Sequence, residues 1–355
     1  MEVKRVEHSS GHVGSGDSGV QKEIIGFLDE TLRPDWDFSI SQEYPSIFGE
    51  FPGGESFYVR ENGRIVSHAA LIVREFQHGE HRLKIGMVGS VTTSKDFRGR
   101  GMAKAVLSQT IEEMRRRGCI LGCLWSGQHE FYRPLGFYRA GQEVDLRFSS
   151  DTVPDIQGPG SIEFDPVLHG HKLWRLYQRH DVRVDRSLEE QKRLVKIPRV
   201  KIFLTEKEGK ITSYIVIHKG ADFENYIHEW GGDISEVFRN VAWVQKHRFE
   251  GKNLTLIAPS HYELGPLEAA ALASWQGVLG LVKVLDRRKL IALYLNYLRE
   301  IEMPHELTKD ETLEMMDEKF DLKDEESLLR VVLGNNTLDI THPVLPFFLW
   351  GLDSI

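Results

Sequence analysis

Apolar residues recur at helical spacing between Met102 and Arg117, and charged residues fall largely between them. The positions expected to face a core are Ala103, Val106, Leu107, Thr110, Ile111 and Met114. Gly118 follows directly, where a left-handed glycine commonly ends a helix. The pattern therefore predicts an amphipathic helix that packs one face against a sheet.

The segments on either side of this helix are apolar enough to form buried strands. A strand is expected to end at Val91 to Thr93, and Cys119 to Trp125 predicts a second one. The chain thus runs from a strand through a loop into a long amphipathic helix and then into a buried strand.

The loop before the helix contains two glycines between two arginines: Arg98-Gly99-Arg100-Gly101, followed by Met102 and Ala103. Glycine lets the backbone approach a ligand closely, and the first amides of a helix favour an anion. Arg side chains would add positive charge to such a phosphate cradle. Taken alone, the segment favours an ordinary strand-to-helix turn with solvated arginines over a phosphate cradle. It is neither a nucleotide-hydrolase phosphate loop, because GKS or GKT is missing, nor a dinucleotide fingerprint, because three spaced glycines are missing.

Two motifs together resemble the GNAT superfamily of N-acetyltransferases. Arg98-x-x-Gly101-x-Ala103 is similar to that family's acyl-CoA pyrophosphate signature. Phe131-Tyr132-Arg133-Pro134-Leu135-Gly136-Phe137 resembles its "FY…LGF" segment, after the helix and strand that the family requires. Both motifs in this order are far more specific than either one alone.

The resemblance implies acetyl-CoA as co-substrate and assigns a role to each of these positions. Backbone amides at the end of the first strand would bind the pantetheine arm and polarise the thioester carbonyl, at Val91, Thr92 and Thr93. Main-chain N–H groups of the loop would hold the pyrophosphate, at Arg98, Gly99, Arg100, Gly101, Met102 and Ala103. Tyr132 would be the general acid for the leaving thiolate, since a tyrosine with a pKa near 10 carries a proton at neutral pH. The alternative is that Tyr132 only packs with Phe131 and Phe137.

The expected reaction is direct transfer of an acetyl group from acetyl-CoA to a primary amine, without an acyl-enzyme and without a metal. Two alternatives stay open: a catalytically silent acyl-CoA-binding sensor or interaction protein, and a transferase for another acyl group. A small-molecule or peptide amine is the expected partner, and the sequence leaves a homo-oligomer open.

Upstream of the loop the pattern predicts a helix near residues 21–32 and a hairpin. Its strands cover residues 57–60 and 65–76 around an Asn62-Gly63 turn. Residues 34–55 are rich in aromatic and acidic side chains, and in GNAT folds such a stretch often shapes the acceptor site. A loop packed on the sheet would have the same composition.

A faint internal repeat aligns residues 57–68 with 203–214, where Phe, Gly, Ile and Ser coincide. A strand at residues 226–230, a helix at 234–247 with Asp233 as its N-cap, and a strand at 254–258 then repeat the order of the first half without the arginine loop. The repeat favours a second, degenerate GNAT-like domain over chance similarity.

The last part of the chain ends in an apolar segment, residues 344–355, that is expected to dock onto the body. The whole layout resembles the enhanced intracellular survival type of acetyltransferase, whose last part is similar to a sterol carrier protein. In that family the free C-terminal carboxylate helps to take the amine proton. The resemblance implies this role for Ile355, and simple core packing of the tail is the alternative.

These patterns predict an α/β protein of the GNAT fold, with a mixed, mostly antiparallel central sheet flanked by helices. The expected divisions are a flexible tail (1–18), a catalytic acetyl-CoA-binding domain (19–150), a degenerate GNAT-like domain (155–270) and a small α/β C-terminal domain (271–355). A chain of 355 residues has room for two or three domains.

Composition narrows the class of protein further. A net charge of −8 argues against a general nucleic-acid binder. No apolar run approaches the about 18 residues that span a membrane, and a basic, apolar signal peptide is missing, so a cytoplasmic enzyme is expected. The two cysteines, Cys119 and Cys123, are expected to be buried free thiols and poor nucleophiles.

Overall fold

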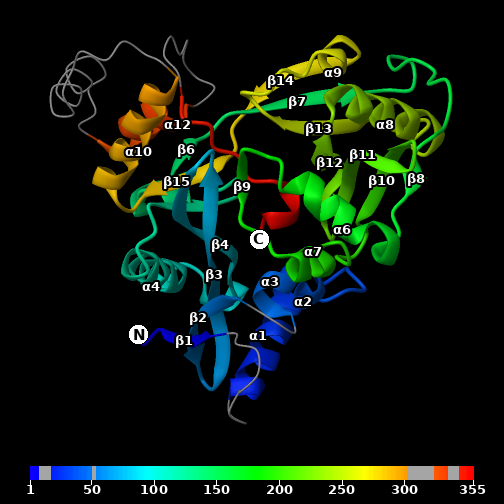
Figure 1. The fold of residues 1–355 in the computed structure, drawn as a ribbon. Helices are drawn as coiled ribbons and strands as arrows, with labels where there is room; N and C mark the ends of the chain where they lie inside the picture. The colour runs from blue at the N-terminus through cyan, green and yellow to red at the C-terminus, as the bar shows by residue number, and fades with distance from the viewer. Residues whose placement is uncertain (8–16, 50–52, 302–323, 335–343) are drawn as a thin grey trace.

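The computed structural model describes residues 1–7, 17–49, 53–301, 324–334 and 344–355, and its two β-sheets lie side by side (Figure 1). Within these residues the first sheet has eight strands, and β9 pairs with β3 beside its main path. The main path runs β1 (Lys4–Glu7), β2 (Gly54–Glu61), β3 (Arg64–His78), β4 (His81–Thr93), β5 (Leu121–Leu124), β15 (Gly280–Val284) and β6 (Tyr138–Ala140), and β9 spans Val182–Val184.

The second described sheet repeats this plan with seven strands. In spatial order they are β8 (Ile162–Glu163), β10 (Lys201–Lys207), β11 (Lys210–Lys219), β12 (Asp222–Gly232), β13 (Leu254–Pro259), β7 (Glu143–Phe148) and β14 (Ala273–Gly277). Each sheet contains one parallel pair, β4 with β5 and β12 with β13, and the other pairs are antiparallel. The two sheets therefore share one strand order, as a repeat would have, and the second GNAT-like domain as such stays a prediction.

Helices cover the sheets. α4 packs on β2, β3 and β4, α1 packs against β3 and β4, and α8 packs on β10, β11 and β12. The helices are α1 (Asp17–Leu32), α2 (Ile40–Glu43), α3 (Pro45–Phe48), α4 (Met102–Arg116), α5 (His129–Tyr132), α6 (Pro166–Tyr177), α7 (Leu188–Leu194), α8 (Ile234–His247), α9 (Pro266–Ala269), α10 (Arg287–Glu300) and α12 (Glu325–Leu333), with 3₁₀ turns η1 (Lys95–Phe97), η2 (Arg133–Leu135) and η3 (Gly351–Asp353).

The two halves exchange strands across the boundaries that the sequence predicts. β7, from the end of the predicted catalytic domain, lies in the second sheet beside β13. β15, from the predicted C-terminal domain, lies in the first sheet between β5 and β6. The separate C-terminal domain stays a prediction, because residues 302–323 and 335–343 lie outside the described residues. Each sheet therefore contains a strand from outside the domain that the sequence predicts for it.

The N-terminal stretch differs from the expected flexible tail. Lys4–Glu7 forms β1, which pairs antiparallel with β2. Residues 8–16 lie outside the described residues, and α1 begins at Asp17, four residues before the predicted helix. Strand pairing explains β1, because residues that read as polar in sequence can still continue the edge of a sheet through backbone hydrogen bonds.

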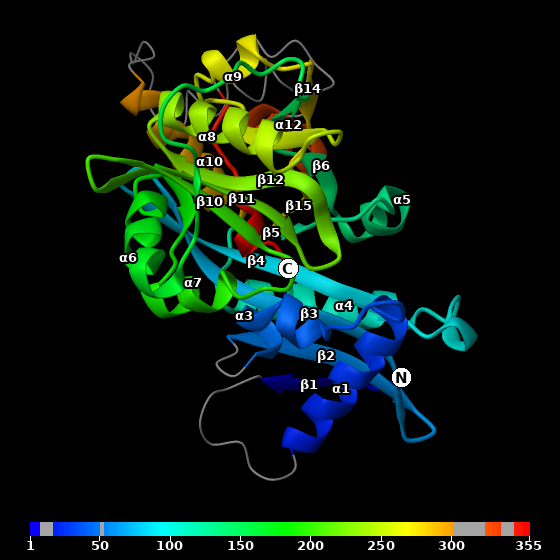
Figure 2. The same ribbon diagram turned by 90° about the vertical axis from the view of Figure 1, so that its right-hand side faces the viewer.

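The C-terminal segment lies between the two sheets (Figures 1 and 2). Its apolar side chains belong to the core cluster that also contains residues of α1 and of both sheets. The buried members are Leu345, Phe347, Phe348, Leu349, Trp350 and Leu352. Docking of the tail, predicted from its apolar composition, is confirmed.

Candidate active site

Strands β4 and β5 separate at the point where the candidate site begins. They pair in parallel only from Ile85 to Met87 on β4, although β4 continues to Thr93. A cleft of about 430 Å³ opens beyond the last pair and is lined by β4 from Val88 to Val91 and by Leu124 to Ser126 after β5. The opening therefore arises from the separation of the two strands themselves.

A bulge in β4 shapes the wall of this cleft. Ser90 has a left-handed φ of 48°, and the pairing with β3 shifts between His68 and Ala70. The fully buried ring of His68 contacts the Ser90 carbonyl oxygen through Nδ1 at 2.9 Å and Ser56 Oγ through Nε2 at 2.7 Å. Because a carbonyl only accepts, Nδ1 carries the proton and donates it. His68 thus supports the strained residue from behind.

The arginine loop lies beyond the end of β4 and leads into α4. Gly99 and Gly101 have φ values of 75° and 76°, and a Cβ on either would meet no atom within 4 Å. Gly101 is the N-cap of α4, and no side chain caps this end of the helix. Two exposed glycines with open space beside them thus directly precede the N-terminus of a 15-residue helix. This is a fit for a phosphate group.

The two arginines of the loop turn back onto its own backbone. Arg98 Nε donates to the Thr93 carbonyl at 3.1 Å, and an Arg100 Nη atom donates to the Asp96 carbonyl at 2.9 Å. The Arg100 guanidinium also lies 5.0 Å from the centre of the Phe97 ring. These contacts fix the shape of the loop and leave the phosphate fit to the main chain.

Tyr132 closes the cleft from the side of β5. It is the last residue of α5, is 6% exposed, and makes edge contacts with Phe131 and Phe137 at centroid distances of 4.9 and 6.2 Å. Burial raises the pKa of the Tyr132 hydroxyl, and a hydrogen bond with Ser126 partly opposes this shift. Tyr132 is therefore both packed in the core and present in the cleft lining, so the two interpretations of its role are compatible.

The last residue of the chain reaches the same cleft. Ser354 and Ile355 line it, and a Cβ built on Gly89 would lie 2.7 Å from the Ile355 carboxyl carbon. Val91, Tyr132 and Ile355 thus come from three distant parts of the sequence to one cavity. Thr92, Thr93 and the residues from Arg98 to Ala103 are not among its lining residues.

Charged groups from both halves line the opposite wall. Asp222, at the start of β12, accepts a 2.5 Å hydrogen bond from the Tyr44 hydroxyl, and its side chain stays 50% exposed. Arg33, at the end of α1, lies 3.8 Å from Asp222 and donates to Glu43 at 2.5 Å. Burial and the Asp222 carboxylate raise the pKa of Tyr44 well above 10, so its hydroxyl stays a donor. Asp222 is the carboxylate of this group that faces the cleft.

The corresponding turn of the second half is closed to a phosphate. Gly232 precedes α8 with a φ of 116°, and a Cβ there would collide with the Thr212 carbonyl oxygen. The Asp233 carboxylate caps α8 and accepts from the Ser235 amide at 3.0 Å. A negative side chain therefore occupies the helix end that an anion would need.

Several lining residues were missed by the sequence analysis. Tyr44 lies in the aromatic and acidic stretch that was noted without a choice of role, and Asp222 and Gly89 were not singled out. No local signal identifies Asp222, because it enters the cleft only through the packing of the second half on α1 to α3. Gly89 carries a weak signal, a glycine inside an apolar strand.

None of the helices described is long and apolar enough to cross a membrane. Among the described residues, no group of three His, Cys, Asp or Glu side chains lies together as metal ligands would.

Comparison with known proteins agrees with this geometry. Residues 40–140 match the family model of an acetyltransferase (GNAT) domain. The chain is 22% identical over 193 residues to an aminoglycoside 2'-N-acetyltransferase from Mycolicibacterium fortuitum. This match covers 49% of this chain and 90% of that protein.

Solved structures share the fold over most of the chain. A probable N-acyltransferase from Enterococcus faecalis superposes with a TM-score of 0.64 at 12% identity, over 83% of this chain and 75% of that one. Eis1 from Mycobacterium abscessus superposes with a TM-score of 0.54 at 13% identity, over 82% of this chain and 75% of that one. The mixed α/β architecture is therefore that of the GNAT fold.

Proposed function

We propose that the chain moves an acetyl group from acetyl-CoA to a primary amine of a small molecule, using the segment 40–140 that matches the family model of a GNAT acetyltransferase domain. The observation that carries this proposal is the meeting of Val91, Tyr132 and Ile355 in one cleft. A bulged strand, a hydroxyl donor and a carboxyl group are the three kinds of group that the reaction needs.

The proposed mechanism is direct attack. The Ile355 carboxylate takes a proton from the ammonium form of the acceptor, because only a neutral amine has a lone pair. The amine nitrogen forms a bond to the thioester carbonyl carbon, and the negative charge that develops on the oxygen is held by backbone N–H groups near Val91 and Thr93. The carbon–sulfur bond then breaks, and Tyr132 gives its proton to the thiolate. The second proton of the attacking nitrogen leaves as the amide forms and, passed through solvent, restores the Tyr132 hydroxyl. Neither a metal nor an acyl-enzyme takes part.

The arginine loop would hold the pyrophosphate of acetyl-CoA. Support comes from the uncapped N-terminus of α4 and from Gly99 and Gly101, whose open sides leave space for a close approach. Arg98 and Arg100 would serve mainly to shape the loop, since both bond to its carbonyls.

A cationic acceptor would meet two carboxylates in the cleft, one of which, Asp222, lies 3.8 Å from Arg33. Asp222 and the Ile355 carboxylate would both attract an ammonium group. The similarity to an aminoglycoside acetyltransferase makes aminoglycosides the first acceptors to test, since they carry several primary amines.

The test is CoA release from acetyl-CoA with a panel of aminoglycosides, polyamines and peptide amines. Gly101→Glu places a carboxylate at the proposed pyrophosphate site and serves as the blank. Gly209→Glu is the matched control, because Gly209 also has a left-handed φ of 76° and open space but lies in the hairpin of the second half. We expect amine-dependent release in the wild type and the control, and none in the blank. Acetyl-CoA binding without release on any amine would contradict transfer, and absence of binding would contradict the whole proposal.

A further inference from the structure

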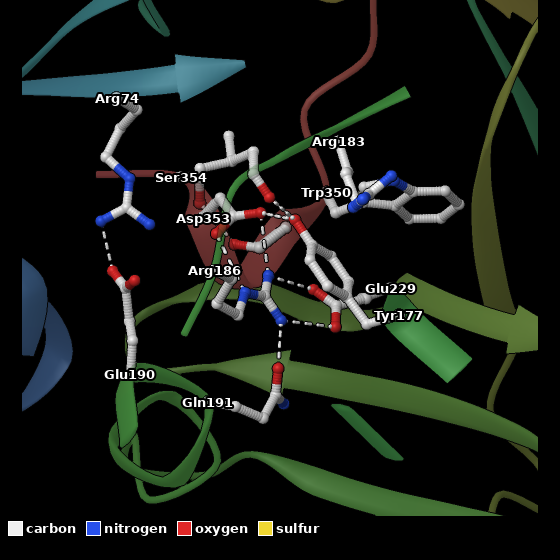
Figure 3. A network of polar contacts seen from close by, with 12 residues as sticks. Arg74, Tyr177, Arg183, Arg186, Glu190, Gln191, Glu229, Trp350, Asp353 and Ser354 are labelled. Atoms are coloured by element: carbon white, nitrogen blue, oxygen red, sulfur yellow. Dashed lines mark hydrogen bonds and ion pairs between the residues drawn. The ribbon is translucent and has the colours of Figure 1, made fainter. Parts of the chain in front are cut away.

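The tail is held by buried charges as well as by its apolar side chains. Arg186, between β9 and α7, is 1% exposed and donates to both carboxylate oxygens of Glu229 at 3.0 and 2.9 Å (Figure 3). The same guanidinium pairs with the Asp353 carboxylate of η3 at 2.8 Å. Tyr177 donates its hydroxyl to Asp353 at 2.7 Å, and its ring lies 3.7 Å from the guanidinium carbon. Asp353 is thus fixed from two directions.

A second buried cation contacts the tail from the hairpin that β11 and β12 form in the second sheet. Lys219, at the end of β11, is 1% exposed and donates from Nζ to the Gly351 carbonyl at 2.9 Å and to Ser354 Oγ at 2.7 Å. It also bonds to the carbonyl of Ser354. All three acceptors lie in the last five residues, so the Lys219 ammonium is hydrogen-bonded to the turn that precedes Ile355.

The backbone of the hairpin is distorted where it presents this lysine. His218 has a left-handed φ of 61°, and the pairing of β11 with β12 shifts between Ile217 and Lys219. Non-glycine residues in this region are strained, and such strain persists only where surrounding contacts hold it. The shift interrupts the alternation of side chains along β11 at Lys219, whose ammonium contacts η3.

Stability alone does not account for these buried charged contacts. Burying charged groups is expensive, and buried ion pairs are often no more stabilising than apolar residues of the same size. The tail already has a set of buried apolar side chains from Leu345 to Leu352. Burial lowers the pKa of Lys219 to about 8, while Asp222, Glu43 and Asp353 favour its charged form, so the ammonium remains protonated at neutral pH. Directional polar contacts add what apolar packing lacks, a fixed orientation of the last residues.

We propose that Lys219 and the Arg186–Asp353 pair are positioning residues that aim the carboxyl group of Ile355 at the acceptor side of the cleft. The inference rests on the proposed function for its chemical meaning. Lys219 fixes the conformation of the last turn through its hydrogen bonds to Gly351 and Ser354. Arg186 holds the side chain of Asp353, which lies between these two residues in the sequence. Because Lys219 and Arg186 belong to the second half, that half, which lacks a phosphate cradle, would contribute to the reaction by orienting a carboxyl group in the cleft.

Hydrogen exchange tests the positional claim without any need for activity. The tail amides of Asp353 and Ser354 donate to the carbonyls of Trp350 and Gly351, so their exchange reports the integrity of the turn. In the full-length protein, Lys219→Met and Asp353→Asn are expected to speed exchange of a peptide covering residues 344–355 at least tenfold. Lys283→Met is the matched control, since Lys283 is also a buried strand lysine, 6% exposed, but pairs with Glu325.

Steady-state kinetics then separates positioning from simple stability. Both variants are expected to lower kcat at least tenfold at a temperature where they remain folded, with the KM for acetyl-CoA unchanged, because the arginine loop lies on another element. If Lys219→Met does not fold, the nearly isosteric Asp353→Asn decides. Tail exchange equal to that of the wild type in a folded variant would overturn the proposal, and so would faster exchange with an unchanged kcat. Should no amine be acetylated at all, the exchange result still stands, so the two failures are distinguishable.

Discussion

Gly89 lies against the carboxyl group of Ile355, and a Cβ on Gly89 would sit 2.7 Å from the carboxyl carbon and 2.8 Å from an oxygen. The φ of Gly89 is outside the left-handed region, so the backbone alone does not require glycine there. The requirement is space: a methyl group at this point of β4 would occupy the position of the carboxyl group. A strand of the first sheet and the last residue of the chain are thus matched in shape.

Gly89→Ala is therefore expected to displace the carboxyl group and lower kcat on the order of 10²-fold, as a small misplacement of a reacting group can. The measurement is CoA release at saturating acetyl-CoA and amine. Gly26→Ala is the control, because a Cβ on Gly26, inside α1, meets nothing within 4 Å. Full activity of folded Gly89→Ala would remove Ile355 from the proposed mechanism.

Tyr132→Phe tests the proposed general acid. The change keeps the edge contacts with Phe131 and Phe137 and removes only the hydroxyl, so kcat should fall roughly 10² to 10⁴-fold while the KM for acetyl-CoA hardly changes. Because burial raises the pKa of Tyr132 above 10, the wild type should lose no activity through this group until the pH exceeds 10. Tyr138→Phe, on β6, is the control. Unchanged kcat in Tyr132→Phe would leave the tyrosine a packing residue.

Much of the fold follows from local patterns. The helix predicted over residues 102–117 is α4, Met102–Arg116, and it ends before Gly118 with its left-handed φ of 75°. The predicted helix 234–247 is α8, with Asp233 as its cap. Hydrophobic periodicity and capping residues act within one element, so a single sequence contains the information.

The partners of each strand could not be predicted in the same way. Nothing local in the segment 143–148 says that it pairs with β13 in the second sheet. From the sequence alone Arg186 looks like an ordinary surface arginine, because its partners Glu229 and Asp353 lie far along the chain. The signature of the loop identified the proposed cofactor site because its residues are contiguous. The acceptor wall and the tail contacts are assembled by long-range packing, which no local pattern contains.

The two cysteines should be inert in the folded protein. Burial raises the pKa of Cys119 to about 11 and that of Cys123 further, and both side chains are buried. Cys119 precedes β5, which begins at Leu121 rather than at the predicted residue 119, yet it is no more accessible for that. Since the thiolate is the reactive form, iodoacetamide at pH 8 is expected to modify neither thiol until the chain is unfolded in guanidinium. Intact mass measures the modification. Labelling of either cysteine in the native state, or loss of activity in a folded Cys123→Ala variant, would contradict the proposed direct mechanism.

Acid should destabilise the protein through two histidines that are buried beside the tail. His180 stacks on Trp350 at a centroid distance of 4.0 Å, and His228 contacts the His218 carbonyl at 2.8 Å. Burial lowers the pKa of each ring from 6.5 to about 3. Because the folded pKa lies below the unfolded one, the unfolded chain binds protons first, and stability is lost as the pH falls below about 6.5.

At pH 5 each histidine would account for about 2 kcal/mol of lost unfolding free energy relative to pH 7. This follows because pH 5 lies about 1.5 units below the pKa of the ring in the unfolded chain. Urea unfolding at pH 7, 6 and 5 measures the slope. His180→Phe keeps an aromatic ring on Trp350 and removes one titrating group, so the loss between pH 7 and pH 5 should shrink by about 2 kcal/mol. His171→Phe, at an exposed position of α6, is the control and should leave the slope unchanged. A slope for His180→Phe equal to that of the wild type would mean that the ring does not have to be neutral to stay beneath the tail.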